Sequence, residues 1–245
     1  MLSRYEADLH IHTLLSPCAE VEMIPPLIVR RAVEAGLDII GIADHNSAEN
    51  VGAVVEAAAG SSVKVIPGME CESAEGVHVL CLFEKVEQAE SMQEVVYAAL
   101  PNLVNQEGKL GQQMVVTAEA EFVRYNDRLL LASTSLSLDD IVAEVEARCG
   151  IAIPAHVDRR AYGLFGVLGF MPEGAGFPAV EVSSRMTAEE ARKQHPDIAD
   201  RAIIRSSDAH VLDDIGSART VFHLEHRSVA EIKLAIAGVG GRMVE

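Results

Sequence analysis

The sequence predicts an α/β fold in which strands alternate with helices and close into a barrel. Three observations predict it. The chain has 245 residues, of which 49% are hydrophobic, and this is enough for a single barrel-sized core. Short apolar runs alternate with helical patterns, and the runs are aliphatic at successive positions, which is typical of parallel strands buried on both faces. Aromatic residues make up only 4%, with no Trp, so the core must be aliphatic.

The elements of the first half follow from apolar runs and helix-end signals. A helix is expected to start at Pro25 and end at Gly36, which are the usual places for proline and glycine at helix ends. A second helix is expected to be capped by Asn46 or Ser47 and to stop at Gly60. The strands of this half are expected at 7–12, 37–43, 63–70 and 77–83.

The stretch 84–135 does not follow the alternation. A helix is expected near 88–100, followed by a polar segment. Two apolar stretches then flank Asn126-Asp127, a pair that resembles a hairpin turn. We therefore expect an insertion or small subdomain here, within one domain that spans 1–245.

The alternation returns in the second half. Ser137 is expected to cap a helix with Asp140 in the capping-box position, and Gly150 ends it. The expected strands are 151–155, 179–182, 202–206 and 220–224, and the expected helices are 160–168, 187–194 and 228–237.

Charge narrows the range of partners. The chain has 37 Asp and Glu against 20 Lys and Arg, a net charge of −17. This argues against a nonspecific binder of long nucleic acid, such as a duplex, and against an anionic membrane surface as partner. A small phosphorylated ligand remains compatible if arginine, lysine or metal cations reverse the local sign. The acid surplus therefore raises the question whether some carboxylates hold metal.

The compartment is expected to be the cytoplasm. The first residues become polar and acidic before an apolar run can form, so no signal peptide is visible. No stretch approaches the roughly 20 apolar residues that a membrane span needs. The four cysteines, Cys18, Cys71, Cys81 and Cys149, form no Cys-x-x-Cys pair.

Six of the nine histidines lie on or at the ends of predicted strands, most with acidic neighbours. The carboxyl ends of parallel barrel strands converge on one mouth, so residues distant in sequence would meet there. Imidazoles and carboxylates gathered at one mouth predict a multinuclear site for Zn²⁺, Mn²⁺ or Fe. The six are His10, His12, His45, His78, His156 and His210.

Spacing supports this prediction. His10 and His12 are two apart on a strand and therefore point to one face, as Asp208 and His210 do on a late strand. Asp8 and Asp44 would orient ligand histidines from behind. A single His-x-His pair is weak evidence, and a lone histidine is more often a core group, so the prediction depends on the whole set. The remaining histidines, His195, His223 and His226, lack this context and are interpreted as surface or structural.

The order of these motifs resembles the PHP (polymerase and histidinol phosphatase) family. The resemblance covers nearly the whole chain, from residue 7 to about 224. It implies a distorted barrel of about seven strand–helix units with two or three divalent metals at its mouth. Phosphoester hydrolysis is the commonest activity that it implies. The matching segments are DLHIHTLLSPCAE, GIADHNS, IPGMECE, VHVLCLF, PAHVDR and SSDAH.

The resemblance also implies a ligand set. One metal would be held by His10, His12, Glu70 and Asp208. Glu70 would bridge to a second metal held by His78 and His156. A third would use His45 and His210.

One further ligand position departs from the family. The family usually places a histidine or aspartate shortly after the first pair, and here Cys18 stands at that offset, with Glu20 as the alternative. If neither binds, the third site is weak or empty. Glu72 is interpreted as an acid behind the ligands.

The implied reaction is attack of a metal-activated hydroxide on phosphorus. Glu70, Asp208 and His210 would be catalytic. Glu70 would be the bridging ligand, and Asp208 would act as base if metal does not occupy it fully. A third metal, or protonated His210 if that site is empty, would stabilise the departing oxygen. Arg159 and Arg185, in loops at the same barrel end, would bind the phosphate, with surface ion pairing as the alternative for each.

The expected substrate is a small nucleotide or phosphomonoester. Three alternatives stay open: a 5′-3′ exonuclease on short oligonucleotides, a non-catalytic metal-binding regulatory module, and amide or lactone hydrolysis. Amide or lactone hydrolysis usually requires a carboxylated lysine at the end of a strand, whereas Lys64 lies at the start of its strand.

Overall fold

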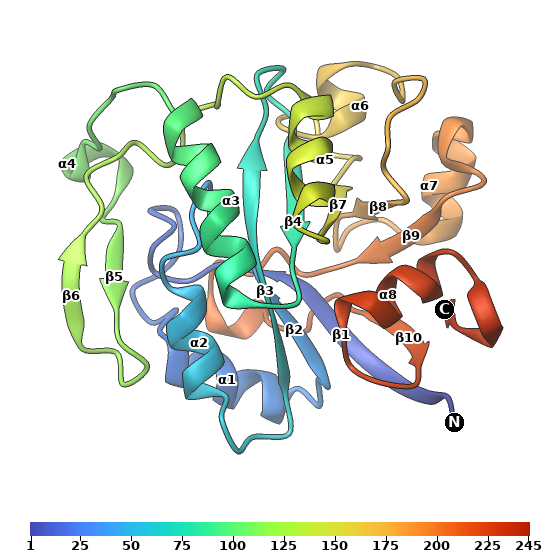
Figure 1. Ribbon diagram of the computed structural model, residues 1–245, viewed down its shortest axis with the longest axis horizontal. Helices are drawn as coiled ribbons and strands as arrows, with labels where there is room; N and C mark the ends of the chain where they lie inside the picture. The colour runs from blue at the N-terminus through green and yellow to red at the C-terminus, as the bar shows by residue number, and fades with distance from the viewer.

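A seven-stranded sheet curls around an aliphatic interior in the computed structural model, which describes residues 1–245 (Figure 1). The strand order is β11-β10-β1-β2-β3-β4-β7, and a separate parallel pair, β8-β9, stands beside it. The bounds are β1 (Ser3–Ile11), β2 (Ile39–Ile42), β3 (Lys64–Glu72), β4 (His78–Leu82), β7 (Ile151–Pro154), β8 (Ala179–Val182), β9 (Ala202–Arg205), β10 (Thr220–Leu224) and β11 (Met243–Val244).

The parallel pair completes the barrel wall through a few backbone contacts. The amide of Val157, just after β7, donates to the carbonyl of Glu181 in β8 over 2.9 Å. On the other side, Ala209 after β9 bridges to Ile11 of β1. The predicted α/β fold with a distorted barrel is therefore confirmed.

Helices pack around the wall. The bounds are α1 (Pro25–Glu34), α2 (Val51–Ala57), α3 (Val86–Ala99), α4 (Glu107–Leu110), α5 (Leu138–Ala147), α6 (Leu164–Val167), α7 (Ala188–Gln194) and α8 (Val229–Ile236). No helix combines the length and apolar character needed to cross a membrane.

Apolar side chains form one cluster inside the barrel and a larger one between the wall and its helices. Leu80 and Leu82 of β4 face the inner cluster, whereas Val79 and Cys81, which alternate with them, face the outer one. This is the alternation that a strand imposes on its side chains. Helix α8 contributes to the inner cluster through Val229, Ile232 and Ala235 and so closes one end of the barrel.

Strand β1 carries the first histidine pair and meets β2 in an irregular register. The pairing shifts between Asp8 and Ile11, the β-bulge that surrounds His10. Bulges re-aim side chains and are common beside active sites. Gly41 lets β2 approach closely here, because a Cβ at that position would lie 2.2 Å from the carbonyl oxygen of Leu9.

One prediction about the strands was wrong, and one strand was not predicted. The prediction of parallel pairing throughout is wrong, because β4 runs antiparallel to β3 and β7, and β10 runs antiparallel to β1. The connection 73–77 between β3 and β4 is too short for a parallel crossover, which needs a dozen or more residues. The short strand β11 was not predicted.

The hairpin in 84–135 was also misplaced. It pairs β5 (Met114–Val116) with β6 (Phe122–Tyr125), so its turn lies at 117–121. Asn126 is instead a buried packing residue whose side-chain amide donates to the Tyr97 hydroxyl over 2.7 Å. The hairpin lies at the side of the molecule, beyond α3 (Figure 1). That 84–135 is an insertion stays a prediction.

One predicted helix end is confirmed, and two predicted helices have different bounds in the structure. The capping box of Ser137 and Asp140 at α5 is confirmed. Helix α2 begins later than expected, with Asn50 as its first flanking residue, because Asn46 uses its side chain to bind carbonyls of Leu130 and Ala132. Of the expected helix 160–168, only Leu164–Val167 is helical.

Candidate metal centre

Glu70 of β3 lies at the centre of the clustered histidines. Its Oε1 is 2.9 Å from His78 Nδ1 and 3.0 Å from His156 Nε2. Its Oε2 is 2.9 Å from His45 Nδ1. His10 Nε2 is 3.4 Å from the first oxygen. Glu70 is buried and presents its two oxygens to imidazoles that come from four different strands or strand ends.

A second group of donors lies on the β1 side of Glu70. His10 Nε2 and His12 Nε2 are 3.2 Å apart, and Asp208 Oδ1 lies 3.0 Å from His12 Nε2 and 3.4 Å from His10 Nε2. These three ligand atoms are close enough to share one ion. His10 and His12 point to the same place because they are two residues apart on one strand.

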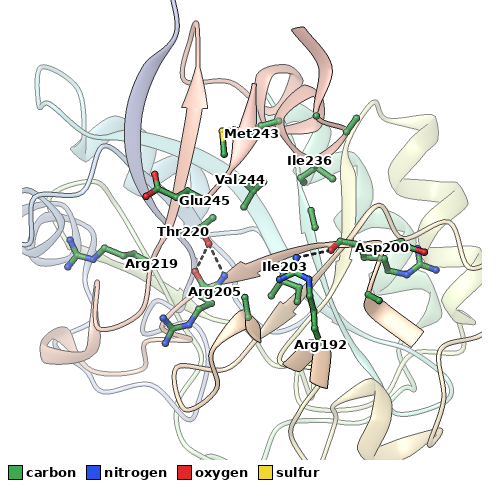
Figure 2. A pocket seen from close by; sticks show the side chains of 17 residues that line it. Arg192, Asp200, Ile203, Arg205, Arg219, Thr220, Ile236, Met243, Val244 and Glu245 are labelled. Carbon is green, nitrogen blue, oxygen red and sulfur yellow. Dashed lines mark hydrogen bonds between the residues drawn. The ribbon is translucent and has the colours of Figure 1, made fainter. Parts of the chain in front are cut away.

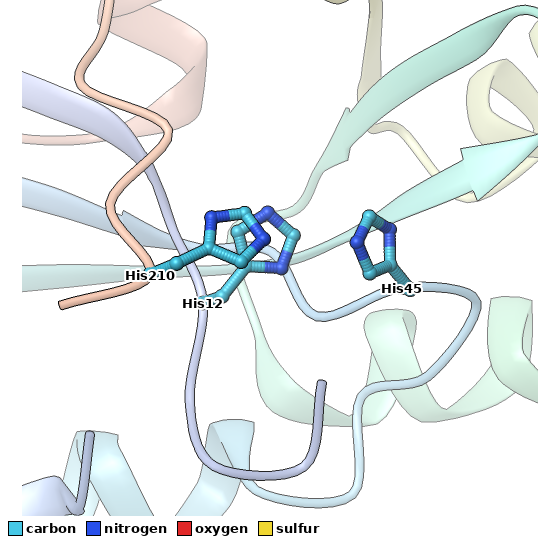
Figure 3. A group of neighbouring side chains, drawn as sticks. All are labelled: His12, His45 and His210. Atoms are coloured by element: carbon cyan, nitrogen blue, oxygen red, sulfur yellow. The ribbon is translucent and has the colours of Figure 1, made fainter. Parts of the chain in front are cut away.

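A third group joins His12 to His45 and His210 (Figure 3). The ring of His12 lies between the other two, with its centroid 4.5 Å from that of His45 and 4.1 Å from that of His210. The structure thus brings together all six histidines that the sequence singled out, with Glu70 and Asp208 among them.

The chemistry of these donors fits divalent metal ions. Imidazole nitrogens and carboxylate oxygens in one buried cluster suit Zn²⁺, Mn²⁺ or Fe. Glu70 Oε2 is buried without a hydrogen-bond partner although it lies among imidazoles. A buried carboxylate oxygen in that state is costly unless a cation satisfies it. The overlapping donor groups are consistent with a polynuclear site.

Charge coupling within the cluster favours ionised carboxylates. Burial alone would raise the pKa of Glu70, but the charges of His78 and His10 hold it well below its usual range. Burial lowers the pKa of His12, and the neighbouring charges of His210 and His45 lower it further. Of these two residues, Glu70 is thus ionised and His12 neutral, the forms that a metal requires of its ligands.

Backbone strain concentrates at the same place. His156, Asp208 and Asn46, which follows His45, have φ values of 28°, 53° and 49°. Non-glycine residues rarely adopt this region, and such strain typically persists at functional sites where the surroundings enforce it. The strain therefore marks the mouth independently of its residue types.

Other acids support the ligands from behind. Glu181 of β8 contacts His10 Nδ1 through both oxygens, at 3.1 and 3.2 Å. Asp44 accepts from the Ser16 hydroxyl over 2.7 Å, and Ser16 Oγ lies 2.9 Å from His12 Nδ1. The sequence analysis missed Glu181 and Ser16, although an acid inside the apolar strand AVEV was a usable signal.

Asp8 has a different neighbourhood from the one expected. Its carboxylate accepts from the backbone and hydroxyl of Ser207 and from the backbone of Gly216, and no histidine side chain binds it. It therefore holds the loop that carries Asp208 rather than a histidine ring.

Cys18 borders the mouth, whereas the exposed Glu20 does not line it. Burial raises the pKa of the Cys18 thiol, but interactions with His210 and His45 bring it down to about 6. Glu72 lines the mouth and accepts from the Ser133 hydroxyl over 2.6 Å, with His78 Nε2 3.6 Å away.

The mouth opens into a cavity of about 280 Å³. Arg159 lies on its rim with Nη1 2.6 Å from Asp208 Oδ2. The ring of Tyr162 stacks on His78 with a centroid distance of 4.4 Å. Arg185 is exposed and does not line the cavity. The three remaining histidines also lie outside the lining, and His195 stacks on Phe165 instead.

The geometry and the motifs agree with a known family. Residues 8–162 match the model described as PHP domain, and residues 200–237 match the one described as PHP-associated. The chain belongs to the PHP family. No curated protein matches it in sequence.

Solved structures show the same fold. Endonuclease Q of Pyrococcus furiosus superposes with a TM-score of 0.74 at 21% identity, over 99% of this chain and 58% of that one. A complex of endonuclease Q with a 27-mer duplex that carries an abasic lesion also gives a TM-score of 0.74 at 21% identity, over 98% of this chain and 58% of that chain. PsfC of Pseudomonas syringae superposes with a TM-score of 0.59 at 17% identity, over 99% of this chain and 91% of the PsfC chain. This PHP chain thus spans little more than half of the endonuclease Q chains.

Proposed function

We propose that this PHP chain is a metal-dependent phosphoesterase. One observation carries the proposal: the buried Glu70 carboxylate lies within 3.0 Å of nitrogens of His45, His78 and His156. A single carboxylate that faces several imidazoles is suited to bridge metal ions. In this assignment Glu70 would belong both to a site with His10, His12 and Asp208 and to a site with His78 and His156. His45 and His210 would hold a third ion.

Two or three divalent ions, when bound, would supply an activated water and neutralise the charge of phosphate oxygens. The residues of the chain contribute positioning and proton transfer. Glu181 fixes the ring of His10, and Ser16 fixes that of His12, so the ligands are oriented in advance. Arg159 on the rim reaches toward Asp208 and would bind a phosphate oxygen of the substrate.

Where the third site is empty, His210 is suited to protonate the leaving oxygen. Burial lowers its pKa, but the neighbouring Cys18 and Asp208 raise it above the usual histidine value. Asp208 Oδ1 is 3.6 Å from His210 Nδ1 and would stabilise the imidazolium form. Asp208 itself would serve as base where metal does not occupy it.

The cavity favours a small substrate. Its volume of about 280 Å³ suits a nucleotide or a phosphomonoester, and the net charge of −17 repels a long polyanion. A carboxylate-rich surface combined with a cationic pocket would select small anions.

A second candidate is cleavage of DNA at a damaged nucleotide. The fold likeness to endonuclease Q, at a TM-score of 0.74, favours it, and one of those structures holds a duplex with an abasic lesion. The acid surplus argues against it, because duplex binding needs a basic footprint. If the chain does bind DNA, the metal ions in the mouth would be the attraction for the DNA strand.

The test is a hydrolysis screen with Mn²⁺ or Zn²⁺. The substrates are p-nitrophenyl phosphate, bis(p-nitrophenyl) phosphate, AMP and a duplex with one abasic site. Glu70→Ala should abolish activity, whereas the matched variant Glu56→Ala, an exposed acid of α2, should retain it. A fully metal-loaded protein that hydrolyses no substrate would contradict the proposal and favour a non-catalytic metal-binding module. Cleavage of the duplex alone would favour the second candidate.

A further inference from the structure

We propose that a cleft at the end of the barrel that α8 closes binds a small organic anion. The cleft has a volume of about 470 Å³ and lies among α7, β9, β11 and the end of α8 (Figure 2). We call it the seam cleft. Its lining includes Arg192, Arg201, Ile203, Arg205, Ile236 and Val244.

The seam cleft is separate from the metal centre. In β9, Ile204 packs in the inner cluster of the barrel, so its neighbours Ile203 and Arg205 face outward. No residue that lines the mouth cavity also lines the seam cleft. A ligand here would therefore leave the metal ligands untouched.

The cleft reverses the charge of the molecule locally. Four arginines and only two acids line it, in a chain whose net charge is −17. Arg219 is paired with Glu6 at 2.7 Å. The two acids are Asp200 and Glu245, and the latter lies 3.1 Å from His223 Nε2. Positive charge gathered in a hollow of an acidic protein attracts anions to that hollow.

The other three arginines form no ion pair. Their guanidinium groups donate only to backbone carbonyls: Arg192 to Arg201 over 3.4 Å, Arg201 to Phe177 over 3.0 Å, and Arg205 to Ser184 over 3.2 Å. A guanidinium has five N–H donors, so most donors of these groups remain available. Arginine donors match phosphate and carboxylate oxygens in a bidentate geometry.

The apolar floor of the seam cleft indicates what the ligand carries besides its anionic group. Ile203 lies at its centre, with Ile236 and Val244 on one side and Arg192 on the other (Figure 2). Arg205 and Arg219 lie toward one end, and their guanidinium groups extend away from Ile203. Apolar side chains beside unpaired guanidinium groups fit a ligand with an apolar body and one phosphate, phosphonate or carboxylate group.

Calorimetric titration of the full chain with benzylphosphonate tests the proposal. This probe combines a ring with a dianionic group that the enzyme cannot hydrolyse by breaking a P–O–C bond. Inorganic phosphate supplies the anion alone, and benzoate exchanges phosphonate for carboxylate, so the three probes separate the two head groups and the contribution of the ring. Arg192→Gln should weaken benzylphosphonate about tenfold, as expected for the loss of one charge-assisted hydrogen bond.

Three further variants control the titration. Arg30→Gln, an exposed residue of α1 that pairs with Glu34, makes the same charge change elsewhere and should leave affinity unchanged. Arg159→Gln weakens the phosphate contact at the mouth and should leave the affinity of the seam cleft unchanged. Arg205→Gln, checked for folding by its melting curve, should weaken binding as Arg192→Gln does. Binding that is lost in Arg159→Gln but kept in both seam variants would overturn the proposal, as would the absence of heat with all three probes.

Discussion

Glu181 holds His10 Nδ1 between its two carboxylate oxygens, at 3.1 and 3.2 Å. Both residues are buried, so the contact fixes the ring of His10 and directs its Nε2 toward Glu70 and Asp208. Carboxylates in this position raise the basicity of a ligand imidazole and set its tautomer.

Glu181→Gln should therefore weaken metal binding by about 10–100-fold, because the amide no longer polarises His10. Competition with a chromophoric chelator measures the affinity. Glu189→Gln on the exposed face of α7 is the matched control and should bind as the wild type does. Equal affinity in both variants would show that Glu181 only fills space.

Arg159 competes with any metal for the carboxylate of Asp208, because its guanidinium lies 2.6 Å from Asp208 Oδ2. Arg159→Gln frees Asp208, so we expect unchanged or tighter metal binding together with a KM for phosphoesters that rises about tenfold, the loss of one charge-assisted contact. Steady-state kinetics and metal titration measure the two effects. Arg160→Gln, its exposed neighbour, should change neither. A KM that stays constant in Arg159→Gln would exclude Arg159 from phosphate binding.

Gly41→Ala should destabilise the fold, since its Cβ would lie 2.2 Å from the Leu9 carbonyl oxygen and β1 and β2 would have to separate. Overpacking of this kind costs about 1–3 kcal/mol or more. Gly108→Ala is the control, because nothing lies within 4 Å of a Cβ there and its φ is ordinary. Urea unfolding of the two variants compares them. A Gly41→Ala protein as stable as Gly108→Ala would mean that the strands adjust without cost.

Glu231 of α8 makes the fold sensitive to acid. Hydrogen bonds from Arg242, at 2.7 and 2.9 Å, lower the pKa of Glu231 from 4.5 to about 2. The ionised carboxylate thus stabilises the fold above pH 4.5, and this contribution is lost as the pH falls from 4.5 toward 2.

The stability of Glu231→Gln should accordingly be lower than that of the wild type at neutral pH, with the gap closing as the pH falls through this window. Chemical unfolding at a series of pH values measures the gap. A gap that is independent of pH would mean that the side chain acts by packing alone.

The sequence was most informative where residues that can bind metal lie at the ends of predicted strands. His10, His12 and Glu70 were predicted to meet because strand periodicity and barrel topology place them at one mouth, and they do lie together. The capping box at Ser137 was predictable because its determinants are local.

Long-range pairing was less predictable. The antiparallel course of β4 depends on the short 73–77 connection, which apolar patterning does not report. The contact between Glu181 and His10 joins residues 171 positions apart, and no local pattern specifies such a pair. Arg185 was assigned to the mouth from its place after β8, but its side chain is exposed and outside the cavity lining.

Metal content of Glu70→Ala, measured by mass spectrometry of the purified protein, tests the central claim most directly. The wild type should carry two or more divalent ions per chain, and Glu70→Ala should lose more than one of them while its circular dichroism stays unchanged, because a bridging carboxylate serves two ions at once. Glu56→Ala should keep the wild-type content. A folded Glu70→Ala protein with the full wild-type metal content would contradict the account.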